Sequence, residues 1–285
     1  MSKLKILLLG SAGMAGHVLK NEFLKLSNKI DLIDIARSNQ YTTPIIKMDI
    51  TDFVSLSDLV ANSNFDYIIN SVGILNKTAE DNPDNAILIN SYLPHFLEKI
   101  TKNTKTKIIH ISTDCVFSGK KGSYVEIDFK DGTGFYAQTK AMGELVNDKD
   151  LTIRTSIIGP DLNSGGIGLF NWFINQSGLV NGFSNAFWSG VTTIQLAKSI
   201  IEIIFSNNSI TGLVHLTNNE KISKYNLLIL IKEVFELKDI EIQELSSYEV
   251  DKSLINTRNE IFRNIPTYKE MIFEMHEWIK TNNQK

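Results

Sequence analysis

The sequence has little of what marks several large classes of protein. It has one cysteine, Cys115, which excludes an internal disulfide and a zinc site built of thiolates. No apolar run approaches the roughly 20 residues of a membrane-spanning helix, and Gly10 interrupts the apolar start too early for a signal peptide. Lysine and arginine number 29 against 32 acidic residues, so no basic surface for nucleic acid or anionic lipid is indicated. We therefore expect a cytoplasmic protein that binds neither nucleic acid nor membrane.

The chain does have the composition of an ordinary globular protein, with 42% apolar and 21% charged residues. In its first two-thirds, short apolar runs alternate with stretches of helical periodicity, such as the one that begins near Ala15. Strands that alternate with helices are typical of parallel βαβ units. The sequence therefore predicts an α/β fold with a doubly wound parallel sheet, whose strands include residues 6–9, 32–35, 67–69, 107–112, 151–154 and 213–216.

A glycine-rich turn follows the first predicted strand and begins a helix. It reads Gly10-Ser11-Ala12-Gly13-Met14-Ala15-Gly16, a GxxGxxG spacing. Glycine permits a tight turn, a close approach of backbone N–H groups to a pyrophosphate, and close packing of helix on strand. The helix N-terminus adds a partial positive charge. The turn predicts a dinucleotide site on a Rossmann-type sheet.

The alternation of strands and helices weakens after about Gly159. Residues 160–190 show no sustained period, and residues 221–285 contain two helical patterns, 224–235 and 268–281. We expect a dinucleotide-binding Rossmann domain of residues 1–158 plus about 191–218. About 159–190 plus 219–285 would form a smaller, discontinuous substrate-binding lobe over the carboxyl ends of the strands, where open α/β sheets bind ligands.

Two signals on the choice of dinucleotide conflict. Asp34 lies where an acid can accept a hydrogen bond from the adenosine ribose of NAD. Arg37, with Ser38, lies where a guanidinium can bind the 2′-phosphate of NADP. We favour NADP(H), with NAD(H) as the alternative. The expected cofactor-binding residues are Gly10, Ser11, Ala12, Gly13, Met14, Arg37, Ser38, Asp49, Ile50, Ser71, Val72 and Gly73, joined by Tyr136 and Lys140.

Tyr136 and Lys140 form a Tyr-x-x-x-Lys pair, which places a phenol and an ammonium on one face of a helix. Reduction of a carbonyl by hydride requires an acid to protonate the oxygen. A free phenol has a pKa near 10, and a neighbouring lysine cation is expected to lower it. Thr113, at the end of an apolar strand, can donate to the same oxygen. Thr113, Tyr136 and Lys140 are therefore the expected catalytic residues.

Together these motifs resemble the extended short-chain dehydrogenase/reductases, that is, the NAD-dependent epimerase/dehydratase superfamily, and most closely its dTDP-4-dehydrorhamnose reductase branch. The resemblance runs over most of residues 3–216. The motifs on which it rests are residues 10–16, the run ISTDCVFSG at 111–119, the run FYAQTKAMGE at 135–144 and the run IRTS at 153–156. It implies Thr113, Tyr136 and Lys140 as the catalytic set, NADPH or NADH as hydride donor, and a nucleoside-diphosphate 4-keto-6-deoxy sugar as substrate.

The chain departs from that branch at two positions. Cys115 stands where the family run usually has an aromatic residue, and Ile157 where rhamnose-forming members often have tryptophan. These departures favour a sister reductase in the synthesis of surface polysaccharide precursors. Its substrate would be another hexose, such as a UDP-linked N-acetyl-6-deoxy-4-ketohexose.

Several further residues are open to more than one interpretation. Trp172 and Trp188 can stack on a sugar or base, although tryptophan more often packs in a core. Asp114 can contact the substrate or cap a turn. The expected substrate-binding residues are Thr113, Asp114, Trp172 and Trp188. The five histidines show no metal-binding spacing, so no metal site is expected, and the chain is predicted to be a monomer or homodimer.

Two other functions fit the same residues. A nucleotide-sugar 4-epimerase or dehydratase would keep NAD tightly bound, which Asp34 favours and Arg37 opposes. A non-catalytic NADP-binding regulatory subunit is the second alternative, because the β subunit of methionine adenosyltransferase resembles the same reductase branch. The complete set of Thr113, Tyr136 and Lys140 favours catalysis.

Overall fold

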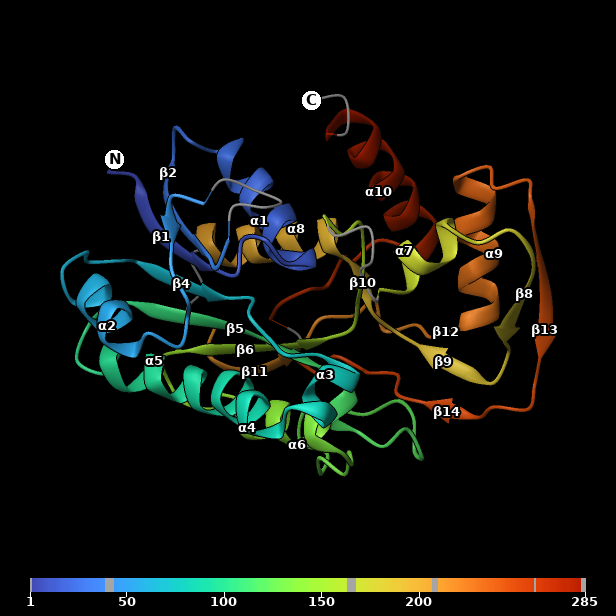
Figure 1. The fold of residues 1–285 in the computed structure, drawn as a ribbon, viewed down its shortest axis with the longest axis horizontal. Coiled ribbons are helices and arrows are strands. Elements are labelled where there is room, and N and C mark those ends of the chain that lie inside the picture. The colour runs from blue at the N-terminus through green and yellow to red at the C-terminus, as the bar shows by residue number, and fades with distance from the viewer. Residues whose placement is uncertain (1, 39–43, 163–167, 207–209, 259, 283–285) are drawn as a thin grey trace.

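The computed structural model describes residues 2–38, 44–162, 168–206, 210–258 and 260–282. A seven-stranded sheet runs through the molecule in the order β11-β6-β5-β4-β1-β2-β3, and every neighbouring pair is parallel. The predicted doubly wound parallel sheet is confirmed (Figure 1). The strands are β1 (Leu4–Leu9), β2 (Ile30–Ala36), β3 (Ile46–Lys47), β4 (Tyr67–Asn70), β5 (Lys107–Thr113), β6 (Leu151–Thr155) and β11 (Gly212–His215).

The strand order reverses between β1 and β4, which are neighbours although β2 and β3 separate them in the sequence. In doubly wound sheets a ligand-binding crevice forms at such a reversal, outside the carboxyl ends of the strands. Leu9 pairs with Asn70, and Asn70 pairs with His110. The turns that follow β1, β4 and β5 therefore meet at one edge of the sheet.

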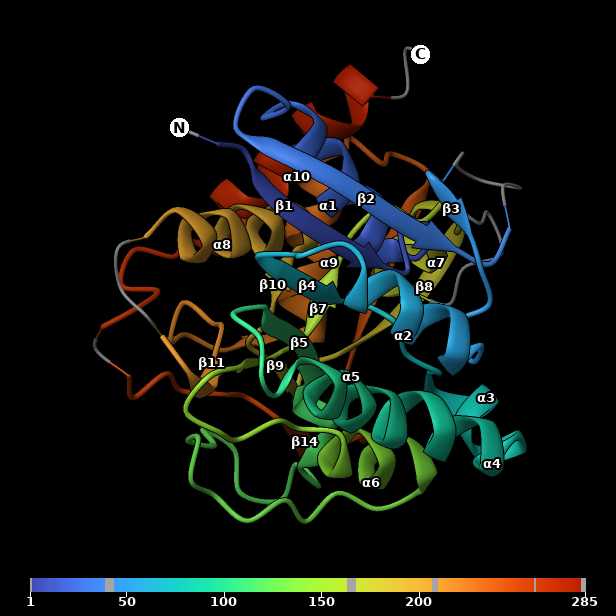
Figure 2. The same cartoon turned by 90° about the vertical axis from the view of Figure 1, so that its left-hand side faces the viewer.

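Helices cover both faces of the sheet (Figure 2). One face carries α1 (Met14–Leu24) and α8 (Thr193–Phe205), and the other carries α2 (Phe53–Ala61), α5 (Leu93–Thr101) and α6 (Phe135–Met142). Alternate residues of β1 belong to different cores: Ile6 and Leu8 pack with α1 and α8, whereas Leu7 and Leu9 pack with α2 and α5. This is the two-residue period of a strand that is buried on both sides.

The segment between β4 and β5 is not one continuous α-helix. The structure has α3 (Asn76–Asp81), α4 (Pro83–Ala86), a π-helix η1 (Ile87–Tyr92) and then α5. The wider turn of a π-helix carries one more residue than an α-turn and is frequent at functional sites. Apolar periodicity does not distinguish it from an ordinary helix.

The remaining elements lie beside the carboxyl edge of the sheet, at the right of Figure 1, apart from α10, which runs back towards α1. A three-stranded sheet has the order β12-β9-β14, and β8 pairs in parallel with β13. The division into two domains stays a prediction. The elements are β7 (Ile157–Ile158), α7 (Leu169–Ile174), β8 (Gly178–Phe183), β9 (Ala186–Trp188), β10 (Val191–Thr192), β12 (Ile222–Ser223), α9 (Lys224–Val234), β13 (Ile240–Leu245), β14 (Val250–Asp251) and α10 (Tyr268–Asn282).

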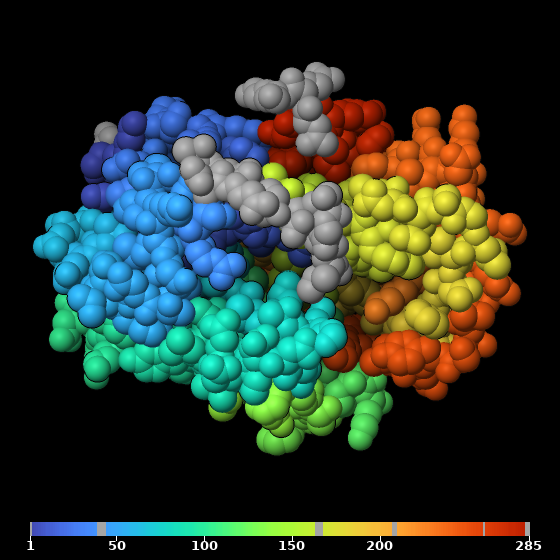
Figure 3. Space-filling model, in the orientation of Figure 1, coloured from blue at the N-terminus to red at the C-terminus, as the bar shows by residue number. Residues whose placement is uncertain are grey.

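The surface is hollowed between the sheet domain and these elements, as the space-filling view shows (Figure 3). None of the helices in the described part of the chain combines the length and the apolar character needed to cross a bilayer.

Candidate active site

The glycine-rich turn joins β1 to α1 as predicted, and two of its glycines are required by geometry. Gly10 has a φ of +86°, in the left-handed region that favours glycine. A Cβ on Gly16 would lie 2.0 Å from the carbonyl oxygen of Gly10, so α1 could not pack so closely with any other residue there. A Cβ on Gly13 would lie 3.4 Å from the same oxygen, an ordinary contact. Gly13 is exposed and leaves the turn open to a ligand.

The first turn of α1 has no side-chain cap. Its N-cap is Gly13, and no side chain accepts a hydrogen bond from the helix N-terminus. Ala12 and Met14 are partly exposed, whereas Ser11 is buried with its hydroxyl directed at the carbonyl oxygen of Ile35. Free N–H groups at a helix N-terminus bind phosphate well. The turn therefore fits the pyrophosphate of a dinucleotide.

The segment after β4 lies against this turn. Ser71 donates its hydroxyl hydrogen to the carbonyl oxygen of Leu9 at 2.6 Å. A Cβ on Gly10 would lie 2.9 Å from Cγ2 of Val72. Gly73 adjoins Asn90 of η1. The predicted cofactor-lining residues Ser71, Val72 and Gly73 thus connect the glycine turn to the helices on the opposite face.

Asp34 and Arg37, near the end of β2, have different surroundings. The Asp34 carboxylate is fully buried, lies 2.9 Å from the Lys20 ammonium and accepts the N–H of Ile45 at 3.2 Å. Arg37 is exposed, and its charge reaches Asp49. Hydrogen bonds from the N–H and hydroxyl of Thr51 are the main cause that lowers the pKa of Asp49, with a smaller contribution from Arg37. Asp34 is therefore held inside the protein.

Three other predicted residues lie near this end of the sheet. Asp49 is exposed and Ile50 is buried in the core between the sheet and α2. Ser38 is partly exposed beside Arg37. These positions agree with residues along one side of an adenosine site, and the assignment of each to the cofactor stays a prediction.

Tyr136 and Thr113 meet at the carboxyl end of β5. The Thr113 hydroxyl lies close enough to the phenol of Tyr136 to influence its pKa. Its oxygen also accepts the N–H of Cys115 at 3.1 Å. Although Tyr136 is partly exposed as a residue, burial of its phenol raises the pKa, Cys115 and Asp114 add to the rise, and the Thr113 hydroxyl opposes it. The expected lowering of this pKa is therefore wrong for this structure.

Lys140 is buried beneath the same site. Its ammonium donates to the carbonyl oxygen of Ile111 at 2.7 Å, and the residue is 4% exposed. Burial lowers the pKa of Lys140 to about 8, against an opposing effect of the Glu144 carboxylate. The ammonium is thus bound to the strand that carries Thr113, and Lys140 is not among the groups that shift the pKa of the Tyr136 phenol.

Asp114 and Cys115 follow Thr113 in a short 3-10 turn, η2 (Asp114–Val116). Asp114 is buried and receives the Thr113 hydroxyl hydrogen at 3.1 Å. Burial raises its pKa, against the charges of Lys252 and Lys224 and the Thr113 hydrogen bond. Burial also raises the pKa of the Cys115 thiol to about 11, so that the thiol stays protonated at neutral pH.

The two predicted tryptophans have different surroundings. Trp172 on α7 is 42% exposed, and its role as a stacking surface stays a prediction. Trp188 is 7% exposed and packs against Tyr268 in the core beside β9. Its ring is enclosed by residues from distant parts of the chain. The structure therefore favours core packing for Trp188, the ordinary interpretation of a tryptophan, over contact with a substrate.

Asn90 was not singled out by the sequence, and it connects the parts of the site. It is fully buried in η1. Its amide donates to the carbonyl oxygen of Ile74 at 2.9 Å and to the Thr139 hydroxyl at 3.1 Å, and it accepts the N–H of Ile74 at 2.8 Å. Asn90 thus joins the segment after β4 to α6. A polar residue within an apolar helical pattern is the one signal that could have indicated it.

A second group of residues that the sequence analysis missed stabilises the C-terminal end of α6. Arg154 of β6 is fully buried and forms two hydrogen bonds, of 2.8 and 2.7 Å, with the Glu144 carboxylate. Arg154 also donates to His215 at 2.8 Å, and Ser112 donates to Glu144. A buried pair stays stable only when its hydrogen bonds are satisfied, as here. This network fixes the end of α6 against β5, β6 and β11.

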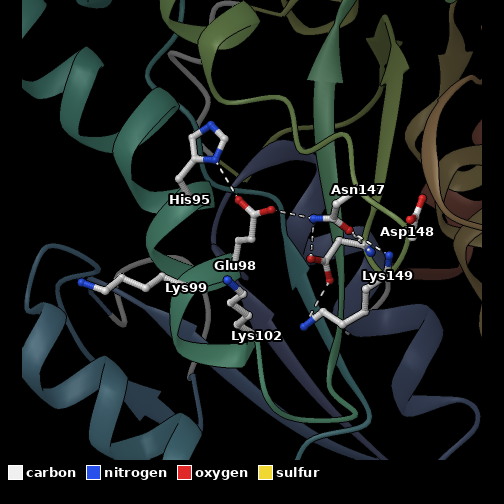
Figure 4. Close-up of a pocket in the computed structure, with 8 residues that line it drawn as sticks. His95, Glu98, Lys99, Lys102, Asn147, Asp148 and Lys149 are labelled. Carbon is white, nitrogen blue, oxygen red and sulfur yellow. Dashed lines mark hydrogen bonds and ion pairs between the residues drawn. The ribbon is translucent and has the colours of Figure 1, made fainter.

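Two cavities lie away from this cluster. One, of about 600 Å³, is bounded by α5 and the segment before β6, where His95, Glu98, Asn147 and Asp150 form a chain of hydrogen bonds (Figure 4). The other, of about 470 Å³, lies between α1, α7 and α10. Neither is lined by Thr113, Tyr136 or Lys140. We locate the candidate active site by the side-chain geometry. No cluster of His, Cys, Asp and Glu in the described ranges could hold a metal ion.

Comparison with protein families gives one match over nearly the whole chain. The profile of the RmlD substrate binding domain matches residues 4–283.

Comparison with curated proteins gives weaker and shorter matches. The dTDP-4-dehydrorhamnose reductase of Mycolicibacterium smegmatis is 29% identical over 143 residues, 49% of this chain and 40% of the reductase. Methionine adenosyltransferase 2 subunit beta of Xenopus laevis is 24% identical over 182 residues, 60% of this chain and 54% of the subunit. The chain spans about half the length of the curated relatives that it matches.

Solved structures match over a larger share of the chain. A hypothetical dTDP-4-dehydrorhamnose reductase of Sulfolobus tokodaii has 27% identity and a TM-score of 0.76, and the match covers 90% of this chain and 93% of that one. The dTDP-4-dehydrorhamnose reductase of Bacillus anthracis in complex with NADP has 19% identity and a TM-score of 0.83, with 97% and 100% covered. At this identity the second likeness shows the fold alone.

Proposed function

This chain belongs to the RmlD substrate binding domain family, and from this premise we propose that it is an NAD(P)H-dependent reductase of a nucleotide-linked 4-keto-6-deoxy sugar. The observation that carries the proposal is that Thr113 at the end of β5 lies beside the phenol of Tyr136, while Lys140 of the same helix reaches the carbonyl oxygen of Ile111 on that strand. This cluster lies at the carboxyl edge of the sheet, one strand away from the segment that contacts the glycine turn. Resemblance of sequence alone does not supply that arrangement.

Each residue of this cluster has a separate role in ketone reduction. A bound nicotinamide cofactor supplies the hydride. The Tyr136 phenol donates its proton to the carbonyl oxygen, and its raised pKa keeps it protonated at neutral pH. The Thr113 hydroxyl lies beside the same phenol and opposes the rise in its pKa, so it stabilises the negative charge that Tyr136 carries once the proton has left. Lys140, one turn further along α6, would hold the cofactor.

NADP(H) is the cofactor that these residues fit better. The adenosine end would lie beside Arg37, Ser38 and Asp49, and the middle along residues 71–73. Since the Asp34 carboxylate is held by Lys20 and Ile45, it does not oppose a 2′-phosphate. Arg37 is exposed and free to approach one. The structure of the Bacillus anthracis reductase contains NADP, which agrees with this choice.

The substrate would bind between the cluster and the lobe of residues about 159–190 and 219–285. Asp114 lies beside Thr113, and the partly exposed Trp172 is the aromatic surface that remains for a sugar or base. Cys115 is small and lies beside the Tyr136 phenol. A small side chain there leaves room for a substituent, and this supports a UDP-linked N-acetyl-6-deoxy-4-ketohexose as the substrate.

The test is a panel of dTDP- and UDP-linked 4-keto-6-deoxy sugars, assayed by the oxidation of NADPH and of NADH. Tyr136→Phe should lower turnover by about 10²–10⁴-fold, the usual contribution of a positioned acid, and leave cofactor affinity nearly unchanged. Tyr248→Phe is the matched control, because Tyr248 is exposed in the lobe and contacts Phe183. Near-normal turnover of Tyr136→Phe would refute the assignment.

A non-catalytic nucleotide-binding subunit is the second candidate, favoured by the likeness to the Xenopus laevis subunit. It predicts cofactor binding without oxidation of NADPH by any ketosugar, together with a stable complex with an unrelated enzyme. An epimerase or dehydratase predicts NAD that co-purifies in stoichiometric amount. The buried, paired Asp34 removes the residue that favoured tight binding of NAD.

A further inference from the structure

His110 is a buried histidine whose ring protonation the structure determines. It lies on β5 opposite Asn70 of β4 and is 1% exposed. The Asn70 side-chain oxygen accepts the N–H of Val72 at 3.2 Å, so the amide nitrogen of Asn70 faces Nδ1 of His110 at 3.1 Å. Nδ1 therefore accepts a hydrogen bond, and in the neutral ring the proton lies on Nε2.

This Nε2–H group has no acceptor. Within the described residues no protein atom hydrogen-bonds to Nε2 of His110, although the atom is fully buried. A buried donor without a partner costs about 1–3 kcal/mol. Native proteins usually satisfy such groups with an ordered water molecule.

The Lys140 ammonium also needs acceptors, and it reaches the backbone of β5 next to His110. It has three donor hydrogens, and the described residues provide it with one acceptor, the carbonyl oxygen of Ile111. Ile111 is the residue after His110. Ser112, on the same face of β5 as His110, donates to Glu144 at the end of α6, so this face lies beneath α6.

His110 and Lys140 also interact electrostatically. Burial lowers the pKa of His110 well below its usual value, and the charges of Lys140 and His95 add to the effect. The ring therefore stays neutral. The charged and titratable groups around Lys140 are Glu144 on its own helix, His110 on β5 and, through His110, His95 on α5.

We propose that His110 is a positioning residue, whose Nε2–H and the Lys140 ammonium donate to one shared buried water molecule. The water accepts both hydrogen bonds and holds the ammonium below Tyr136. His110 in turn is held by Asn70, which also binds the cofactor-lining segment through Val72. The role of this lysine in turnover rests on the proposed function, whereas the water site does not.

The pH dependence of kcat/KM tests the role of His110. In the wild type, activity should fall as pH rises through about 8, where the Lys140 ammonium loses its proton. His110→Leu removes the donor and its water, and should move this fall to lower pH by about one unit, since one hydrogen bond to a charged group is worth about 1.5–3 kcal/mol. His110→Gln keeps an N–H donor at the corresponding position and should restore most of the shift.

Thr193→Val is the matched control, because the Thr193 hydroxyl is the other buried side-chain polar atom without a partner in the described residues, and it lies on α8. Its profile should match the wild type. Thermal unfolding and NADP titration establish that each variant is folded. An unchanged profile for His110→Leu, or equal profiles for His110→Leu and His110→Gln, would overturn the proposal.

A crystal structure of the wild type decides the question even if His110→Leu does not fold. We expect electron density for a water molecule within hydrogen-bonding distance of both His110 Nε2 and Lys140 Nζ. A well-defined map that shows no water molecule at this position would overturn the proposal. If the protein turns over no ketosugar, the proposed function is wrong. The electron density still tests the water site independently of that result.

Discussion

Burial decides the electrostatics of the site at the scale of single residues. It raises the pKa of Tyr136 and Asp114 and lowers that of Lys140 to about 8. Each shift disfavours the charged form. The phenol therefore keeps its proton at neutral pH, as the proposed role of Tyr136 as an acid requires. Where a charge is retained inside the protein, as at Asp34, a partner such as Lys20 compensates it.

Arg37 provides a prediction at this scale. Arg37→Ala should weaken NADPH binding by about tenfold or more, since a charge-assisted hydrogen bond is worth about 1.5–3 kcal/mol, and should leave NADH binding nearly unchanged. Titration by nicotinamide fluorescence measures both. Asp34→Asn is the control: it removes the buried negative charge that lies 2.9 Å from the Lys20 ammonium and lowers stability, with the cofactor preference retained. Equal losses for both cofactors in Arg37→Ala would contradict the assignment.

At the scale of helices and strands, close packing between elements holds the site together. The helix α6, which carries Tyr136 and Lys140, lies so near η1 that a Cβ on Gly143 would be 1.9 Å from the carbonyl oxygen of Asn90. Ser91 of η1 donates to the carbonyl oxygen of Thr139 at 2.8 Å. The helix α1 approaches the glycine turn just as closely at Gly16. Both contacts require glycine because any side chain would separate the elements.

The glycine turn gives a prediction for this scale. Gly16→Ala should destabilise the fold by at least 1–3 kcal/mol, the usual cost of overpacking, because the new Cβ would overlap the Gly10 carbonyl. Gly13→Ala should leave stability nearly unchanged and weaken NADP binding, because its Cβ has room in the protein but faces the ligand. Urea unfolding and NADP titration separate the two effects. The reverse pattern would show that the roles of the two glycines are exchanged.

The buried network of Glu144, Arg154 and His215 ties distant segments together at the scale of the whole molecule. Its members come from the end of α6, from β6 and from β11. His215 also binds Glu126 through its backbone N–H and Ile255 through its ring. Burial is the main cause that lowers the pKa of His215 to about 4, and the Arg154 charge adds to it, whereas Glu126 and Glu144 oppose it.

Acid stability is the prediction that follows. Between pH 6.5 and about 4 the unfolded chain binds a proton at His215 that the native state does not. The contribution of His215 to the free energy of unfolding should therefore be nearly constant above pH 6.5 and should fall as pH decreases below it. Urea unfolding at pH 7 and pH 5 measures the loss, to which His110 also contributes. His215→Gln should show a smaller loss between these two values, and an equal loss would argue against this residue as a source.

The sequence by itself determined six of the seven strands of the large sheet, the glycine turn and the placement of Tyr136 and Lys140 on one helix. These depend on local periodicity and on residues close together in the chain, which a sequence displays directly. The tertiary structure alone decided that Asp34 pairs with Lys20, that Trp188 is enclosed by Tyr268 and that η1 turns Asn90 towards Thr139. It also decided the direction of the Tyr136 pKa. Each of these depends on desolvation and contact between segments far apart in the chain, and only the folded packing brings those segments together.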